Sequence, residues 1–151
     1  MYRKAFFAIC LNGFALAFTW GITVTNIPWL FDRVGIKETD LGIWFTIFAV
    51  LQLIFSQLSG RVIVPLIGTT KTLMLGQLSF AIFPYIFITA NNIQIFFLSS
   101  IPLSIAAGLI FPTIASSTNF IENKTKRIYQ TYQQASFSFG FIISGIFASL
   151  F

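Results

Sequence analysis

The sequence predicts an all-α integral membrane protein with about five transmembrane helices. Hydrophobic residues make up 56% of the 151-residue chain, charged residues make up only 9%, and the mean hydropathy is +0.86. A typical soluble domain is about 25% charged, so this chain has too little polar surface to cover a soluble fold. Its apolar runs are about twice as long as a membrane strand and lack alternation of period two, which argues against a β-barrel.

Five hydrophobic spans follow one another along the chain, at roughly 5–30, 41–66, 70–90, 94–116 and 129–151. Backbone polar groups in lipid must be satisfied within the spanning segment, so we expect each span to be helical. The connections between spans are short, which predicts one antiparallel bundle and a single transmembrane domain over residues 1–151. Thr39 and Asp40 follow the first connection, and we expect them to provide the N-cap of the second helix.

The basic residues predict the orientation of the spans. If successive spans alternate in direction, one side of the membrane receives seven of the nine basic residues: Arg3, Lys4, Arg61, Lys71, Lys124, Lys126 and Arg127. The other side receives Arg33 and Lys37, together with the carboxylates Asp32, Glu38 and Asp40. By the positive-inside rule, we expect a multi-pass protein of the inner (plasma) membrane with a cytoplasmic N-terminus. The net charge of +5 is therefore explained by the lipid bilayer as partner, without any nucleic acid.

The residues needed for catalysis or metal binding are missing from the sequence. Histidine is absent, Cys10 is the only cysteine, and no charged residue lies deep in a predicted span. We also find no glycine loop for phosphate, no paired carboxylates and no Ser/His arrangement. We therefore expect no enzymatic activity, no metal and no cofactor.

Polar residues inside the spans indicate where a solute would bind. Asn12, Thr19, Thr23 and Asn26 are spaced so that they share one face of the first helix. Such a face either forms hydrogen bonds between helices, at about 0.6 kcal/mol per contact, or lines a path for a solute. The sequence leaves both interpretations open. The fifth span opens with Gln130, Gln133 and Gln134, for which hydrogen bonding between helices is the favoured interpretation.

Small residues recur every four positions in the last two spans. The stripes are Ser104, Gly108, Pro112 and Ser116 in the fourth span, and Ser136, Gly140, Ser144 and Ala148 in the fifth. Stripes of this kind let helix backbones approach closely, so we expect both to pack against membrane helices, one possibility being each other.

Three segments together resemble the N-terminal half of a major facilitator superfamily transporter, in its fucose-permease-like and related sugar- or drug-transporter branches. They are residues 25–28 followed by 40–42, residues 60–71, and residues 119–127 followed by 134–140. In that branch a polar residue opens the fifth helix and a glycine follows six places later, as Gln134 and Gly140 do here. The resemblance implies a partial six-helix bundle, and it adds Gln134 to the solute-facing candidates Asn12, Thr19, Thr23 and Asn26.

The second of these segments stands in the place of the superfamily's signature, G-x-x-x-D-R-x-G-x-[KR]. Gly68 and Lys71 fit the tight, basic cytoplasmic turn of that signature, and Gly60, beside Arg61, is one place out of register. Pro65 and Leu66 stand where the aspartate and arginine are expected. The resemblance therefore implies that the charge pairing that normally locks the cytoplasmic gate is lost.

The leading hypothesis is a truncated superfamily chain, because the last hydrophobic run reaches Phe151 without a polar flank. Its parent would move a small organic solute by alternating access, and we expect the fragment alone to be inactive. Two alternatives stay open: a small membrane scaffold or accessory subunit that binds other membrane helices, and a compact self-assembling transporter.

Overall fold

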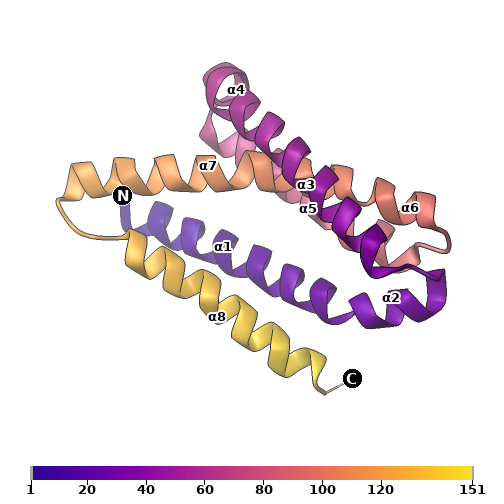
Figure 1. The fold of residues 1–151 in the computed structure, drawn as a ribbon. Coiled ribbons are helices and arrows are strands. Elements are labelled where there is room, and N and C mark those ends of the chain that lie inside the picture. The colour runs from indigo at the N-terminus through magenta and orange to yellow at the C-terminus, as the bar shows by residue number, and fades with distance from the viewer. Residues whose placement is uncertain (1, 151) are drawn as a thin grey trace. The chain divides into compact units, whose positions relative to one another are not determined.

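The computed structural model describes residues 2–150 and is all-α, as expected, with no strand in that part of the chain (Figure 1). The helices are α1 (Tyr2–Thr25), α2 (Ile27–Val34), α3 (Glu38–Leu58), α4 (Val64–Ile67), α5 (Thr69–Thr89), α6 (Ile93–Leu98), α7 (Ser100–Thr125) and α8 (Gln130–Ala148). A π-helical turn, η1 (Ser59–Ile63), joins α3 to α4.

Four helical stretches within residues 2–150 are long and apolar enough to cross a membrane. They are Tyr2–Thr25, Glu38–Ile67, Thr69–Thr89 and Ile93–Thr125. The predicted fifth span corresponds to α8, which is 19 residues long but is not among the four. Three glutamines in its first turns and several serines lower its hydropathy, so its crossing of the membrane stays a prediction.

Proline explains two interruptions that the predicted continuous spans did not include. A proline has no N–H to donate, and its ring clashes with the carbonyl four residues earlier. Pro28 lies in the first turn of α2, and the first span accordingly breaks between Thr25 and Ile27. Pro65 lies in the first turn of α4, directly after the π-helical turn, which widens the backbone where the proline would otherwise clash.

The connection between α2 and α3 is shorter than predicted. Gly35 ends α2 in the left-handed conformation, with φ of 71°, and its N–H donates to the Phe31 carbonyl at 3.0 Å. The predicted N-cap at Thr39 and Asp40 is wrong, because α3 already begins at Glu38. Asp40 instead acts from inside the first turn, where its carboxylate accepts the Lys37 N–H at 2.9 Å.

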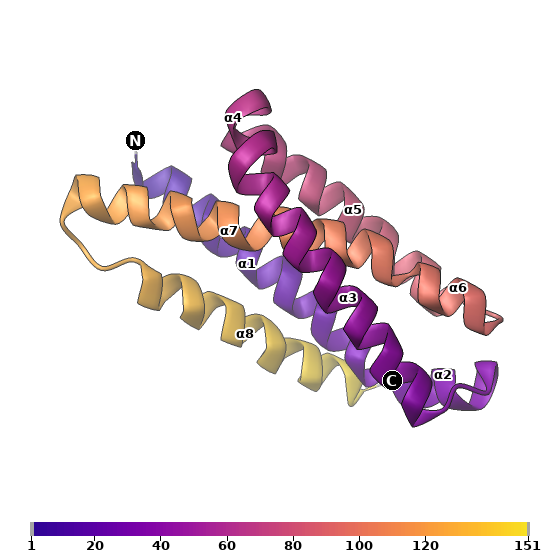
Figure 2. The same cartoon turned by 45° about the horizontal axis from the view of Figure 1, so that its top comes forward.

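The chain divides into two compact units, one of residues 1–25 and 114–151 and the other of residues 26–113. In the first unit α1 and α8 pack together along their lengths and run in the same direction (Figures 1 and 2). Phe6 meets Tyr129 at one end, with ring centroids 4.5 Å apart, and Phe18 meets Phe147 towards the other end, at 6.0 Å.

The second unit is built around Trp44 of α3, which is 1% exposed. Its ring contacts Phe83 and Phe87 of α5 and Phe96 of α6, with centroids 5.7–6.4 Å apart. The indole N–H donates to the Phe96 carbonyl and to the Ser99 hydroxyl, both at 3.1 Å. A buried indole with a satisfied N–H ties these helices together without leaving an unpaired donor.

Candidate functional site

Three of the predicted solute-facing residues lie on one side of α1. Asn12 and Thr19 are half-buried, and Thr23 is 2% exposed. The Thr23 hydroxyl donates to the Thr19 carbonyl at 2.8 Å, so it is satisfied within its own helix. At about 100° per residue, the three side chains fall within roughly 40° of one another around the axis. They form what we call the α1 polar face.

The α1 polar face is turned away from α8. The side of α1 that packs on α8 carries Gly13 and Gly21, which meet Gln133 and Ser144. Helical geometry places this side about half a turn from Asn12 and Thr19. The α1 polar face and the side that packs on α8 are therefore different sides of α1.

The other two predicted residues do not lie on α1. Asn26 lies at the break between α1 and α2 and belongs to the second unit, where its carbonyl accepts the Leu30 N–H at 3.3 Å. Gln134 lies on α8 and is exposed, about a third of a turn from the side that packs on α1.

Of the three glutamines for which the sequence favoured contacts between helices, Gln133 is the one that faces α1. It is 8% exposed, and its Nε2 lies 3.3 Å from the position that a Cβ on Gly13 would take. The available signal was its register: Gln133 precedes Gly140 by seven residues, so it continues the small-residue stripe of α8. Gln134 falls outside that stripe.

The two small-residue stripes contact different helices. On α8, Ser136 donates to the Cys10 carbonyl at 2.7 Å, and a Cβ on Gly140 would lie 2.6 Å from the Phe14 carbonyl oxygen. On α7, Ser104 donates to the Phe48 carbonyl of α3 at 3.1 Å. A Cβ on Gly108 would likewise meet the α3 backbone, 2.9 Å from the Ser56 nitrogen.

The remaining stripe residues differ in burial. Ser144 is 1% exposed, Pro112 and Ala148 are half-buried, and Ser116 is exposed.

The segment in the place of the superfamily signature is open and mostly exposed. Gly60 and Arg61 lie in the π-helical turn, and Gly68 separates α4 from α5 with φ of 83°. Lys71 is exposed in the first turn of α5, and Thr72 donates to the Gly68 carbonyl at 2.9 Å. At the start of the π-helical turn, the buried hydroxyl of Ser59 lies 3.4 Å from the buried hydroxyl of Thr113 on α7.

A strip of phenylalanine rings runs along α1 and α8. Phe14 stacks on Phe18 and contacts Phe139, and Phe18 contacts Phe147, each with ring centroids 6.0 Å apart. Phe139 and Phe147 keep 55% and 49% of their surface exposed. The first unit therefore presents an aromatic strip as well as a polar face.

Comparison with known proteins identifies one family. The sequence profile described as Major Facilitator Superfamily matches residues 9–151, which is nearly the whole chain. No solved structure matches.

The relatives carry names from drug resistance. The chain is 29% identical over 143 residues to multidrug resistance protein 2 of Bacillus subtilis (strain 168), covering 93% of this chain and 36% of that protein. It is 23% identical over 142 residues to quinolone resistance protein NorA of Staphylococcus aureus (strain Mu50), with the same two coverages. The chain therefore spans about a third of the length of these curated relatives.

Proposed function

This chain belongs to the Major Facilitator Superfamily, and on that premise we propose that it forms part of a membrane transporter for a small organic solute. The transporter would work by alternating access, in which two helical bundles rock about a site near the middle of the membrane. The chain would supply one wall of that site. The first and last helices would enter from the cytoplasmic side, as the basic residues favour.

The α1 polar face carries this proposal. Polar side chains in membrane helices face protein or water rather than lipid, and these three share one side of α1. Asn12 offers an amide and Thr19 a hydroxyl, which can donate and accept hydrogen bonds without bringing a charge into the membrane. A site of this kind suits a neutral or weakly polar solute.

The names of the relatives favour a drug-like solute. The named relatives include a quinolone resistance protein, and quinolones are flat aromatic compounds. We therefore propose flat, drug-like organic molecules as the solute class.

We propose that the chain does not transport by itself. Sites in such transporters lie between two repeats, and this chain covers 36% of the length of its relatives. Purified chain in liposomes should take up no more quinolone than empty liposomes do. Uptake well above the empty liposomes would instead support the compact self-assembling transporter.

The test of the site replaces the aligned segment of the Bacillus relative with residues 9–151 and measures quinolone efflux from cells. In this chimera the variant N12L/T19V should lower efflux about thirtyfold, since two hydrogen bonds to the solute at about 1 kcal/mol each are lost. The matched control is T46V, because Thr46 is exposed and its hydroxyl bonds only within α3, to the Gly42 carbonyl.

An active chimera in which N12L/T19V works as well as T46V would show that the α1 polar face does not bind the solute. A chimera that reaches the membrane but moves no solute would favour the scaffold or accessory-subunit alternative.

A further inference from the structure

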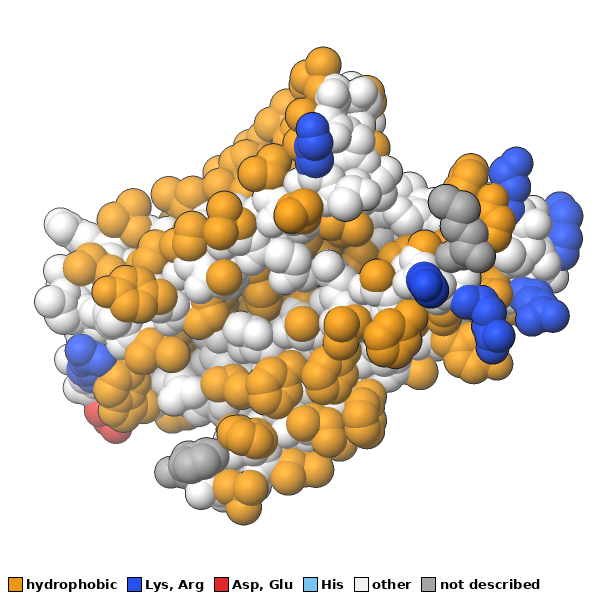
Figure 3. Space-filling view, turned by 180° about the vertical axis from the view of Figure 1, so that it is seen from behind, with side chains coloured by type: hydrophobic (Ala, Val, Ile, Leu, Met, Phe, Trp, Pro, Cys, Tyr) orange, Lys and Arg blue, Asp and Glu red, His pale blue; other side chains and the backbone are white. Residues whose placement is uncertain are grey.

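Five cations gather at one end of the first unit. Arg3 and Lys4 open α1, while Lys124, Lys126 and Arg127 lie where α7 passes into α8. Two ring contacts hold these segments together, with Tyr2 6.5 Å from Phe120 and Phe6 4.5 Å from Tyr129. In Figure 3 blue side chains gather at the right of the view, among orange hydrophobic ones. We call these five residues the cation cluster.

The one carboxylate of this unit does not neutralise the cation cluster. Glu122 accepts the backbone N–H groups of Tyr129 and Gln130 at 2.6 and 2.7 Å. These bonds turn the carboxylate into the loop, where it satisfies two donors at the start of α8. Within residues 2–150, none of Lys124, Lys126 and Arg127 forms an ion pair, and Lys124 lies instead over the Phe120 ring at 5.9 Å.

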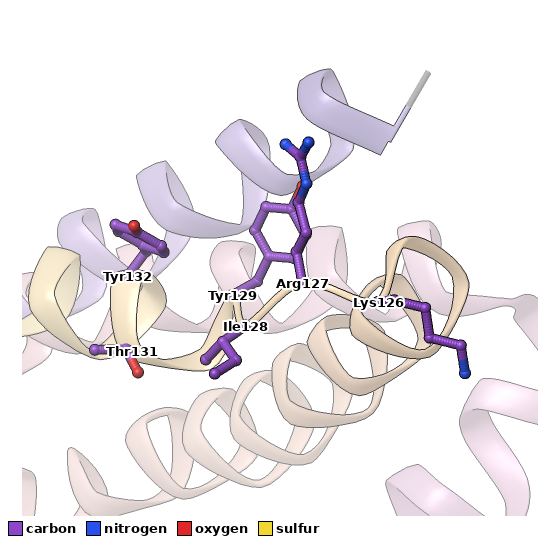
Figure 4. Close-up of a pocket in the computed structure, with 6 residues that line it drawn as sticks. All are labelled: Lys126, Arg127, Ile128, Tyr129, Thr131 and Tyr132. Atoms are coloured by element: carbon purple, nitrogen blue, oxygen red, sulfur yellow. The ribbon is translucent and has the colours of Figure 1, made fainter.

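A hollow of about 720 Å³ lies beside the loop, lined by Lys126, Arg127, Ile128, Tyr129, Thr131 and Tyr132. Arg127 and Tyr129 extend to the same side of the chain in the close-up, with Tyr132 on the next turn (Figure 4). The lining combines two cations with three hydroxyl-bearing side chains. Such a set of groups can both pair with a phosphate and donate hydrogen bonds to it.

Exposed apolar side chains surround the same loop. Ile128 is 74% exposed, Tyr132 66% and Phe120 56%, all beside the cations. A soluble phosphate would gain nothing from these side chains, but a lipid would, because its acyl chains lie next to its headgroup. Tyrosine is also a typical residue of the boundary between membrane and water.

We propose that this loop binds the headgroup of an anionic phospholipid. Arg127 pairs with the phosphate, Tyr132 donates a hydrogen bond to the headgroup, and Ile128 enters the acyl region. Lys126 extends away from Arg127 in the close-up and adds positive potential at the edge of the hollow (Figure 4). Arg3 and Lys4 add positive potential from α1. Basic residues near a membrane surface attract anionic lipid strongly enough for two of them to change retention by about thirtyfold.

The test is native mass spectrometry of the full chain in detergent, with equal amounts of phosphatidylglycerol and phosphatidylcholine. The chain should retain phosphatidylglycerol in clear preference, and K126Q/R127Q should lower that retention by about thirtyfold. The matched control R61Q/K71Q removes the same charge from the segment around Gly68 and should retain the lipid. Circular dichroism of each variant checks that the helices are intact, and R127K, which keeps the charge, should retain the lipid.

Three results would overturn the proposal. One is equal retention of both lipids by the unmodified chain. Another is equal loss in both double variants, which would show attraction to net charge alone. The third is displacement of phosphatidylglycerol by inorganic phosphate at the same concentration, which would make the loop a site for free anions.

Discussion

At the residue scale, glycine decides how closely α1 and α8 approach. A Cβ on Gly140 would lie 2.6 Å from the Phe14 carbonyl oxygen and 2.9 Å from the Ala17 Cβ, and neither atom can move without the helix. Gly145, five residues later on α8, has nothing within 4 Å of the same position. Substitutions of Gly140 and Gly145 on the same helix therefore compare a crowded position with an open one.

We expect G140A to destabilise the first unit by about 1–3 kcal/mol, since an added methyl group forces the helices apart. G145A should leave stability unchanged or raise it, because alanine favours a helix. Thermal unfolding in detergent, followed by circular dichroism, measures both. Equal unfolding temperatures for the two variants would show that the close approach at Gly140 is not required.

Trp44 should be the most sensitive aromatic residue of the second unit. W44F keeps most of the ring contacts but removes the N–H that bonds the Phe96 carbonyl and the Ser99 hydroxyl. We expect a loss of about 1–2 kcal/mol in the same unfolding measurement. W29F is the control, because Trp29 is 46% exposed. An equal loss in W29F would contradict the role assigned to the indole N–H.

The packing role of a single residue could be predicted from the sequence only where the spacing along one helix revealed it. The stripe through Gly140 and Ser144 was visible at intervals of four. The choice between Gln133 and Gln134 required the helical phase relative to α1, which one helix does not reveal. The partners of Trp44 on α5 and α6 lie 39 or more positions away in the sequence, so no local pattern could name them.

At the scale of elements, Glu122 connects the end of α7 to the start of α8. Its carboxylate holds two backbone N–H groups that α8 cannot satisfy itself. We expect E122A to speed hydrogen exchange at Tyr129 and Gln130 by at least tenfold, since hydrogen bonds to a charged group are worth about 1.5–3 kcal/mol.

N123A is the control for E122A. Asn123 is exposed beside Glu122, so the variant should leave exchange at both amides unchanged. Unchanged exchange in E122A itself would mean that water replaces the carboxylate at little cost.

Breaks in helices were only partly predictable. Pro28 and Pro65 were visible, and the physical cost of proline inside a helix explains why α1 ends at Thr25 and why a π-helical turn precedes α4. The start of α3 was missed because the Asp40 carboxylate accepts the N–H of Lys37, three residues earlier, instead of an N–H later in the helix. Sequence alone offers both possibilities for an aspartate near a helix start.

At the scale of the whole molecule, the proposed orientation predicts which loops can be reached from outside the cell. In a C10S background, K37C lies in the connection between α2 and α3, and K126C lies between α7 and α8. A membrane-impermeant maleimide should label K37C in intact cells and K126C only after permeabilisation. The reverse pattern would show that the N-terminus lies outside.

The fold class followed from composition, because a chain with 9% charged residues has few alternatives to membrane helices. The site was less predictable. The spacing of Asn12, Thr19 and Thr23 predicted that they share one face of α1, and in the structure they do. Which group faces them depends on other helices, and the sequence of α1 does not reveal that. Gln134 came from resemblance, and it lies exposed on α8, as the fifth span predicted.

The pairing of α1 with α8 also has a consequence for biogenesis. Ser136 reaches Cys10 across 126 positions of sequence, so the glycine side of α1 lacks this partner until α8 has been synthesised. At about 5–20 residues per second, that interval lasts roughly 6–25 s on the ribosome. During it α1 must wait in the bilayer or in the insertion machinery, and a protease or a foreign helix could reach its glycine surface first.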